Sequence, residues 1–244
     1  HLSKVKDTLN RPKQLLLLLL HGLLPVAIIH LQGDDGTALV MAVIFAAMLF
    51  TAGLSWKYIL PVAAMIPPAA IVAWNFLLDD DKKNRILAVI DPTLVEAADS
   101  WQQQRGLISI GNGGLWGNGV FMETGQFRYV PEVYNDFIFT YIGETVGFIG
   151  CLAVLLVLAF LCIRILSNGL RAPDDLGKYI CVGVFAMIGI QIIINIGMCL
   201  GMMPVIGVTL PFLSAGGTST GTLYLAIGVV LSVYVHSGKD MLFG

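Results

Sequence analysis

The sequence predicts an all-α protein, a polytopic transmembrane helix bundle with six spans and one long extracytoplasmic loop. Hydrophobic residues make up 57% of the 244 positions and charged residues 12%, whereas an ordinary soluble domain carries about 25% charge. Mean hydropathy is +0.82, and no Asp, Glu, Lys or Arg occurs between Lys178 and Lys239. This composition excludes disordered chains and secreted disulfide scaffolds, and the net charge of −2 argues against a nucleic-acid partner.

Six apolar stretches come close to the about 20 residues that cross about 30 Å of hydrocarbon. The third contains Pro61, Pro67 and Pro68, which a membrane helix tolerates when neighbouring groups satisfy the freed backbone. The four cysteines lie in apolar stretches without a CxxC pair, so we interpret them as small buried hydrophobes. The six spans form a single membrane domain over residues 1–244, at about 15–31, 36–54, 58–78, 137–163, 179–201 and 220–235.

The distribution of Lys and Arg predicts the orientation of the spans. These residues occur in the N-terminal tail, after the second and fourth spans and after the last, whereas the short connections 32–35 and 202–219 carry none. The positive-inside rule therefore places both termini in the cytoplasm. The long loop at 79–131 then lies outside, and aromatic residues such as Trp101 and Trp116 predict short interfacial helices and glycine turns there.

Two acidic residues accompany the fourth span, where burial of a charge is costly and indicates function. At 100° per residue, Asp136, Thr140 and Glu144 fall on one helix face, and Gly143 and Gly147 leave room beside them for a ligand or another backbone. Two structural alternatives stay open. Asp136 could be a helix N-cap, and Glu144 could be the partner of a hydroxyl on a neighbouring helix.

An uncharged segment at 207–221 is rich in glycine and hydroxyl groups. Close helix packing is the more common use of such residues in membranes. Alternatively, their backbone and hydroxyl donors could bind a pyrophosphate or a sugar, which makes candidates of Ser214, Gly216, Gly217, Thr218 and Ser219. The sequence contains no Walker loop, HExxH or GxSxG motif, and motif spacing alone indicates no metal-ligand set.

Six short motifs follow one another along nearly the whole chain. They read Gln32-Gly-Asp-Asp-Gly-Thr-Ala38, Ala52-Gly-Leu-Ser-Trp-Lys57, Asp91-Pro92, Ile110-Gly-Asn-Gly-Gly-Leu-Trp-Gly-Asn-Gly119, Val130-Pro-Glu-Val-Tyr-Asn-Asp-Phe-Ile-Phe139 and Leu210-Pro-Phe-Leu-Ser-Ala-Gly-Gly-Thr-Ser219. In this combination the chain resembles the SEDS family of bacterial cell-wall proteins (RodA, FtsW and SpoVE), and its spans resemble the last six of that family's ten helices. The family usually has Pro, His, Thr, Glu and Tyr where this chain has Gly33, Tyr134, Asn135, Thr145 and Ala215.

The resemblance implies a peptidoglycan glycosyltransferase that polymerises lipid II at the outer face of the bacterial plasma (inner) membrane, for elongation, division or sporulation. Asp136 matches the family's essential acidic residue, the general base, and a helix N-terminus would lower the pKa of such an Asp. Arg105 and Arg128, or a divalent cation (Mg or Mn) held by Asp136 and Glu132, would neutralise the undecaprenyl pyrophosphate leaving group. Glu132 and Glu144 are predicted, like the two arginines, to contribute to substrate binding.

The resemblance also implies a class B penicillin-binding protein as partner. Small residues on the fourth and fifth spans (Gly147, Gly150, Ala153 and Gly189) would let its single membrane anchor dock closely. Two other functions remain open at this stage: a lipid II flippase or other transporter, and a non-catalytic, truncated partner of a penicillin-binding protein.

Overall fold

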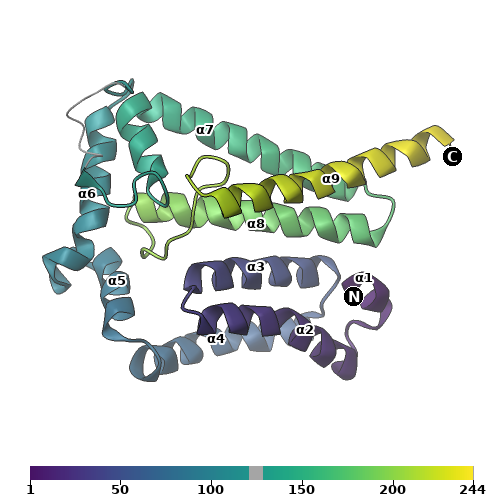
Figure 1. Cartoon of the computed structure of the whole chain (residues 1–244). Helices are drawn as coiled ribbons and strands as arrows, with labels where there is room; N and C mark the ends of the chain where they lie inside the picture. Colours follow the sequence, from purple (N-terminus) through teal and green to yellow (C-terminus); the bar gives the residue numbers. More distant parts are fainter. Residues whose placement is uncertain (121–128, 244) are drawn as a thin grey trace. The chain divides into compact units, whose positions relative to one another are not determined.

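The computed structural model describes residues 1–120 and 129–243, which fold into helices joined by turns and contain no strand (Figure 1). The predicted all-α fold class is confirmed. The elements are α1 (Leu2–Val5), η1 (Lys6–Thr8), α2 (Pro12–Leu31), α3 (Asp35–Thr51), α4 (Trp56–Phe76), α5 (Asp80–Ile90), η2 (Pro92–Leu94), α6 (Ala97–Gly113), α7 (Ile138–Leu170), α8 (Asp175–Cys199) and α9 (Gly217–Phe243).

Within these residues, five helices are long and apolar enough to cross a membrane: α2, α4, α7, α8 and the 217–237 part of α9. The stretch predicted as the second span forms α3, which is apolar but 17 residues long. None of the residues of α4 is buried within the chain, although its mean hydropathy is 1.7. An apolar helix exposed in this way requires lipid or another apolar partner around it.

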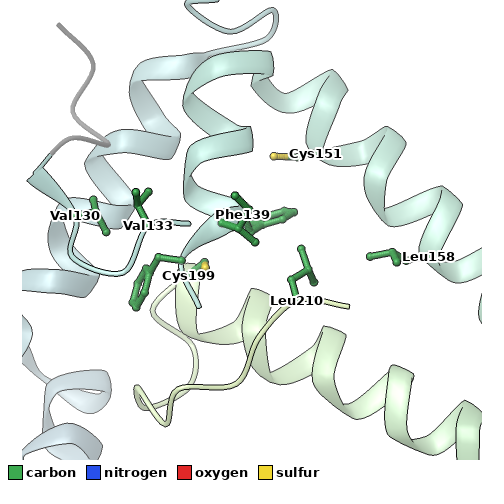
Figure 2. Close-up of a cluster of buried hydrophobic side chains, with 9 residues drawn as sticks. Val130, Val133, Phe139, Cys151, Leu158, Cys199 and Leu210 are labelled. Carbon is green, nitrogen blue, oxygen red and sulfur yellow. The ribbon is translucent and has the colours of Figure 1, made fainter. Parts of the chain in front are cut away.

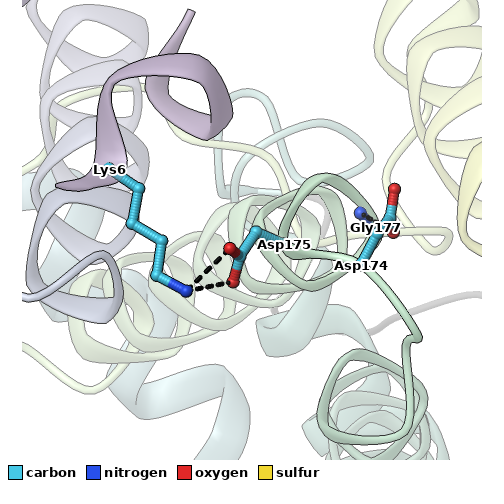
Figure 3. Close-up of polar contacts among 4 residues, drawn as sticks. All are labelled: Lys6, Asp174, Asp175 and Gly177. Atoms are coloured by element: carbon cyan, nitrogen blue, oxygen red, sulfur yellow. Dashed lines mark hydrogen bonds and ion pairs between the residues drawn. The ribbon is translucent and has the colours of Figure 1, made fainter.

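One compact unit gathers the N-terminal segment with α2, α3 and the beginning of α8. Lys6 of η1 forms an ion pair with Asp175, with 2.7 Å between Nζ and Oδ2 (Figure 3). Next to it, Asp174 caps α8 by accepting a hydrogen bond of 2.9 Å from the Gly177 N–H, as N-cap residues do. The unit comprises residues 1–61, 159–191 and 218–244.

The second unit contains residues 62–158 and 192–217. Its core joins the turn before α7, the first turns of α7, the end of α8 and the segment that follows α8 (Figure 2). Phe137, Cys199 and Leu210 are at most 1% exposed in this core. All four cysteines are free and buried, and their predicted burial is confirmed.

Helix α7 is interrupted at Gly147, whose φ of 74° and ψ of −169° are not helical. A break inside an apolar span frees backbone groups that lipid cannot hydrogen-bond. The glycine-rich loop after α6 supplies the missing partners. The main-chain hydrogen bonds between the loop and α7 run from Asn118 N to Glu144 O (2.9 Å), Gly119 N to Thr145 O (2.9 Å), Phe148 N to Gly114 O (2.9 Å) and Ile149 N to Leu115 O (3.2 Å).

The end of α6 and the loop after it approach α7 so closely that two of their glycines have no room for a side chain. A Cβ on Gly113 would lie 1.9 Å from the Gly143 carbonyl oxygen, and one on Gly117 would lie 2.3 Å from the Thr145 carbonyl oxygen. The space that the sequence predicted beside the polar face of this helix is therefore occupied by another backbone.

Replacement of Gly147 should test this junction. In Gly147→Ala, the Cβ would meet the Gly117 nitrogen at 2.3 Å, and a non-glycine residue at positive φ costs about 1–3 kcal/mol. At about 2–4 °C per kcal/mol for a chain of this size, thermal unfolding in detergent should begin at least several degrees lower. Gly189→Ala on α8, where a Cβ meets open space, is the control and should change little. Equal stability of the two variants would contradict this account of the break.

Candidate active site

Asp136 lies in a tight turn that leads into α7. The N–H groups of Asn135 and Phe137 both donate to the Glu132 carbonyl, at 2.9 and 3.2 Å, and Glu132 adopts a positive φ of 53°. The buried Phe137 side chain anchors the turn in the core. Because α7 begins at Ile138, Asp136 stands two residues before the helix and not at its N-cap.

The Asp136 carboxylate is half-buried against the segment that follows α8. Its Oδ1 atom is buried without a hydrogen-bond partner among the described residues, and its Oδ2 atom lies 3.9 Å from the place of a Cβ on Gly207. Burial raises the pKa of Asp136, a hydrogen bond from its own backbone N–H opposes this shift in part, and the negative charge of Glu132 raises the pKa further. The expectation that a helix N-terminus lowers this pKa is wrong, because the side chain precedes the helix and the effect of burial exceeds that of the backbone N–H that its carboxylate meets.

Thr140 and Glu144 lie deeper on α7, and α6 covers both of them. Thr140 is fully buried, and a Cβ on Gly106 of α6 would lie 3.3 Å from its hydroxyl oxygen. Glu144 is 1% exposed and accepts a hydrogen bond from the Ser109 hydroxyl of α6. The contact of Glu144 with a hydroxyl on a neighbouring helix agrees with the structural alternative, and a role in substrate binding stays a prediction.

The glycine- and hydroxyl-rich segment reaches the Asp136 turn through its backbone. The Ala215 N–H donates to the Tyr134 carbonyl at 2.7 Å, which places Ser214 and Gly216 beside the turn. The Ser214 hydroxyl accepts from the Leu210 N–H at 2.7 Å and so closes its own turn. Of the other candidates, Gly217 is the first residue of α9, and Thr218 and Ser219 follow in its first turn, in the unit that contains the N-terminal segment.

The structure describes one of the two arginines that were predicted to neutralise the leaving group. Arg105, on α6, lies with its guanidinium 5.6 Å from the centre of the Trp101 ring, a cation–π distance. Arg128 lies outside the described residues. Arg85 on α5 was not among the predicted residues, yet its Nη1 donates to the Val205 carbonyl at 3.1 Å, next to the loop that flanks Asp136. Its only signal in the sequence is its place in an amphipathic stretch.

Asn195 of α8 was also missed. Its side-chain nitrogen donates to the Asp136 carbonyl at 2.7 Å and to the Val208 carbonyl at 2.8 Å. An uncharged polar residue inside an apolar span is costly unless it is hydrogen-bonded, and that signal could have found it.

Comparison with known proteins identifies the family. The FtsW/RodA/SpoVE family, described as cell cycle proteins, matches residues 2–239. The chain belongs to this family. It is 33% identical over 218 residues to peptidoglycan glycosyltransferase MrdB of Escherichia coli (strain K12), covering 87% of this chain and 58% of that protein. It is 37% identical over 210 residues to stage V sporulation protein E of Bacillus subtilis (strain 168), covering 86% and 57%.

Solved structures agree with this membership. The chain matches a chain of a peptidoglycan synthase complex, studied for its coordination of polymerization and crosslinking, with a TM-score of 0.79, 26% identity, and coverage of 97% of this chain and 66% of that one. It also matches the rod shape determining protein RodA of Thermus thermophilus, with a TM-score of 0.59, 25% identity, and coverage of 96% and 62%. The chain thus spans about three fifths of the length of these relatives.

The protonation of Asp136 can be followed without any assay of activity. Because burial and Glu132 both disfavour the charged form, the proton should persist to higher pH than on an ordinary Asp of pKa about 3.9. Infrared spectroscopy of the protonated carboxyl band, assigned by its loss in Asp136→Asn, should show this. In Glu132→Gln one repulsive charge is gone, so the band should disappear at lower pH. A band unmoved by Glu132→Gln would remove Glu132 as a cause of the shift.

Proposed function

We propose that this protein is a peptidoglycan glycosyltransferase that polymerises lipid II into glycan strands at the outer face of the plasma membrane. The observation that carries the proposal is Asp136, a carboxylate with a buried, unpartnered oxygen in a turn at the end of an apolar helix. The names of the relatives MrdB and FtsW support it. A substrate on a lipid carrier also explains why the reacting group lies at the end of a membrane span.

In the proposed reaction, Asp136 takes the proton from the 4-hydroxyl of the acceptor GlcNAc. The oxygen then forms a bond to C1 of the donor MurNAc, while the bond from C1 to undecaprenyl pyrophosphate breaks and that group leaves with the electron pair. A general base works best when its pKa lies near the operating pH. The raised pKa of Asp136 therefore strengthens it as a base, provided that the carboxylate remains ionised near neutral pH.

The leaving group carries negative charge that needs a cation. Arg105 is the predicted arginine that the structure describes, and Arg85 of α5 is a further guanidinium, bonded to the Val205 carbonyl of the neighbouring loop. A divalent cation such as Mg or Mn would fit Asp136 and Glu132, since Mg²⁺ typically uses one or two carboxylates together with water and substrate phosphates. The described residues hold no cluster of three or more His, Cys, Asp or Glu side chains, so the remaining ligands would come from solvent and substrate.

Transport fits the chain less well than catalysis. A transporter needs polar groups through the whole membrane, yet α7 carries only apolar residues and glycine between Val146 and Ile163. The deepest acid of this span, Glu144, is covered by α6 and already bound to Ser109.

Asp136→Asn should separate an enzyme from a transporter or a scaffold. The amide keeps the size of the side chain but does not accept the proton, so lipid II polymerisation by the purified full-length protein should fall by about 10²-fold or more. Glu144→Gln keeps an acceptor for Ser109 and should lower the rate much less. Polymerisation by Asp136→Asn at a near-normal rate would overturn the assignment of the base, and absence of polymer with the unaltered protein would favour the other functions.

The orientation is testable by cysteine accessibility. We place both termini in the cytoplasm, so that the loop with Trp116 lies outside and Lys57 lies inside. Trp116 is 79% exposed, so a cysteine at this position should react with an impermeant maleimide in intact cells. A cysteine at position 57 should react only after lysis. The reverse pattern would place Asp136 on the cytoplasmic side and contradict an extracytoplasmic reaction.

We further propose a class B penicillin-binding protein as partner, with its membrane anchor on α7. Of the predicted small residues, Gly147 and Gly150 are buried within the chain, whereas Ala153 is exposed between Leu152 and Leu156, which are 43% and 62% exposed. Ala153→Trp should therefore reduce co-purification of the partner several-fold without loss of folded protein. Undiminished recovery would move the interface away from this part of α7.

A further inference from the structure

We infer that Asn195 is a positioning residue that fixes the main chain of Asp136 and the loop beside it; this inference rests on the proposed role of Asp136 as the base. Asn195 is fully buried on α8. Its one side-chain nitrogen bridges two carbonyl groups, those of Asp136 at 2.7 Å and Val208 at 2.8 Å.

The Asp136 carbonyl needs this partner because no backbone hydrogen bond of α7 uses it. In a regular helix the N–H of residue 140 would donate to it, but the Thr140 N–H donates to the Phe137 carbonyl at 3.0 Å. Besides Asn195, the Cys199 thiol approaches the Asp136 carbonyl, and does so at 3.8 Å. The orientation of the peptide group that carries the base therefore depends on a side chain from another helix.

The second carbonyl belongs to the loop that flanks the carboxylate. Val208 follows Gly207, which has a positive φ of 69° and whose Cβ position lies 3.9 Å from Asp136 Oδ2. By holding both carbonyls at once, Asn195 sets the separation between the base and this loop. Its hydrogen bonds go to main-chain carbonyls and not to the carboxylate, so it acts through Asp136.

The chemistry of the contact favours a carboxamide. An uncharged group with two N–H donors on one nitrogen is found in Asn and Gln, whereas a hydroxyl offers one donor and a carboxylate none. Leu at this position would have a similar size but would leave both carbonyls without this donor. A Ser would restore at most one of the two bonds.

The chain offers a matched control in Gln103 of α6. Its buried carboxamide also bridges two carbonyls of this unit, Met198 at 3.2 Å and Met203 at 2.7 Å. It thus secures the end of α8 and the start of the same segment without touching Asp136. Gln103→Leu should therefore lower the stability of the fold as much as the loss of such a bridge does, but it should leave the position of Asp136 unchanged.

The test measures lipid II polymerisation by the full-length purified protein, normalised to the fraction that is folded by size-exclusion chromatography and thermal unfolding. A misplacement of about 1 Å costs about 10²-fold in rate, so Asn195→Leu should lower kcat by about 10- to 100-fold and leave KM within about twofold. Asn195→Ser, a milder change, should lie between Asn195→Leu and the unaltered protein. Gln103→Leu should keep kcat within about threefold.

A double-mutant cycle separates positioning from general stability. Residues that act as a unit are not additive, so Asn195→Leu should change the residual rate of Asp136→Asn by no more than about twofold. A loss of kcat that Gln103→Leu reproduces, or a full additional loss in the Asp136→Asn background, would overturn the inference. If Asp136→Asn itself polymerises normally, the proposed function fails. If Asp136→Asn is inactive and Asn195→Leu is normal, the positioning role alone fails.

Discussion

The interruption of α7 at Gly147 is the constraint on which this arrangement depends. A backbone break in an apolar helix exposes N–H and C=O groups, each of which costs several kcal/mol if it stays unpaired in hydrocarbon. The loop after α6 satisfies these groups by main-chain hydrogen bonds on both sides of the break, and Gly113 and Gly117 permit the contact because a Cβ would collide with α7. Since this loop continues directly from α6, the same bonds hold α6 against the first turns of α7.

That placement decides the surroundings of the polar residues on α7. With α6 in contact, Thr140 and Glu144 become interior groups, and Ser109 provides the partner that a buried carboxylate needs. Asp136 precedes the part of α7 that α6 covers and lies in the turn before the helix. It is held from the other side by Asn195 and by the segment after α8. Glu144 is thus enclosed, whereas Asp136 is only half-buried, and partial exposure is a condition for a base that must meet a substrate.

Much of this could be predicted from the sequence, because membrane spans follow from local hydropathy and length. Because burial of a charge in a membrane is costly, the sequence indicated a functional role for Asp136 and Glu144. Glu144 is indeed buried, at 1% exposure. The fourth helix was predicted at 137–163 but extends over Ile138–Leu170, since Arg164 and the polar residues after it do not end a helix. Gly143 and Gly147 were predicted to leave room for a ligand or another backbone. In the structure, Ile110 of α6 lies against Gly143, and the backbone of the loop after α6 lies against Gly147.

What the sequence did not reveal are the contacts between segments far apart in the chain. Arg85 reaches Val205 across 120 positions, and Asn195 joins the Asp136 turn to α8, pairings that no local pattern encodes. The pKa of Asp136 was predicted in the wrong direction because it depends on where the helix begins and on what buries the carboxylate.

The central claim, that Asp136 is the general base, is tested most directly by its distance to the acceptor sugar. In a cryo-EM structure of the full-length protein with a lipid-linked disaccharide acceptor, a carboxylate oxygen of Asp136 should lie about 2.6–3.2 Å from the 4-hydroxyl oxygen of GlcNAc. An acceptor whose 4-hydroxyl lies outside hydrogen-bond reach of Asp136 and meets a different basic group would contradict this role of Asp136.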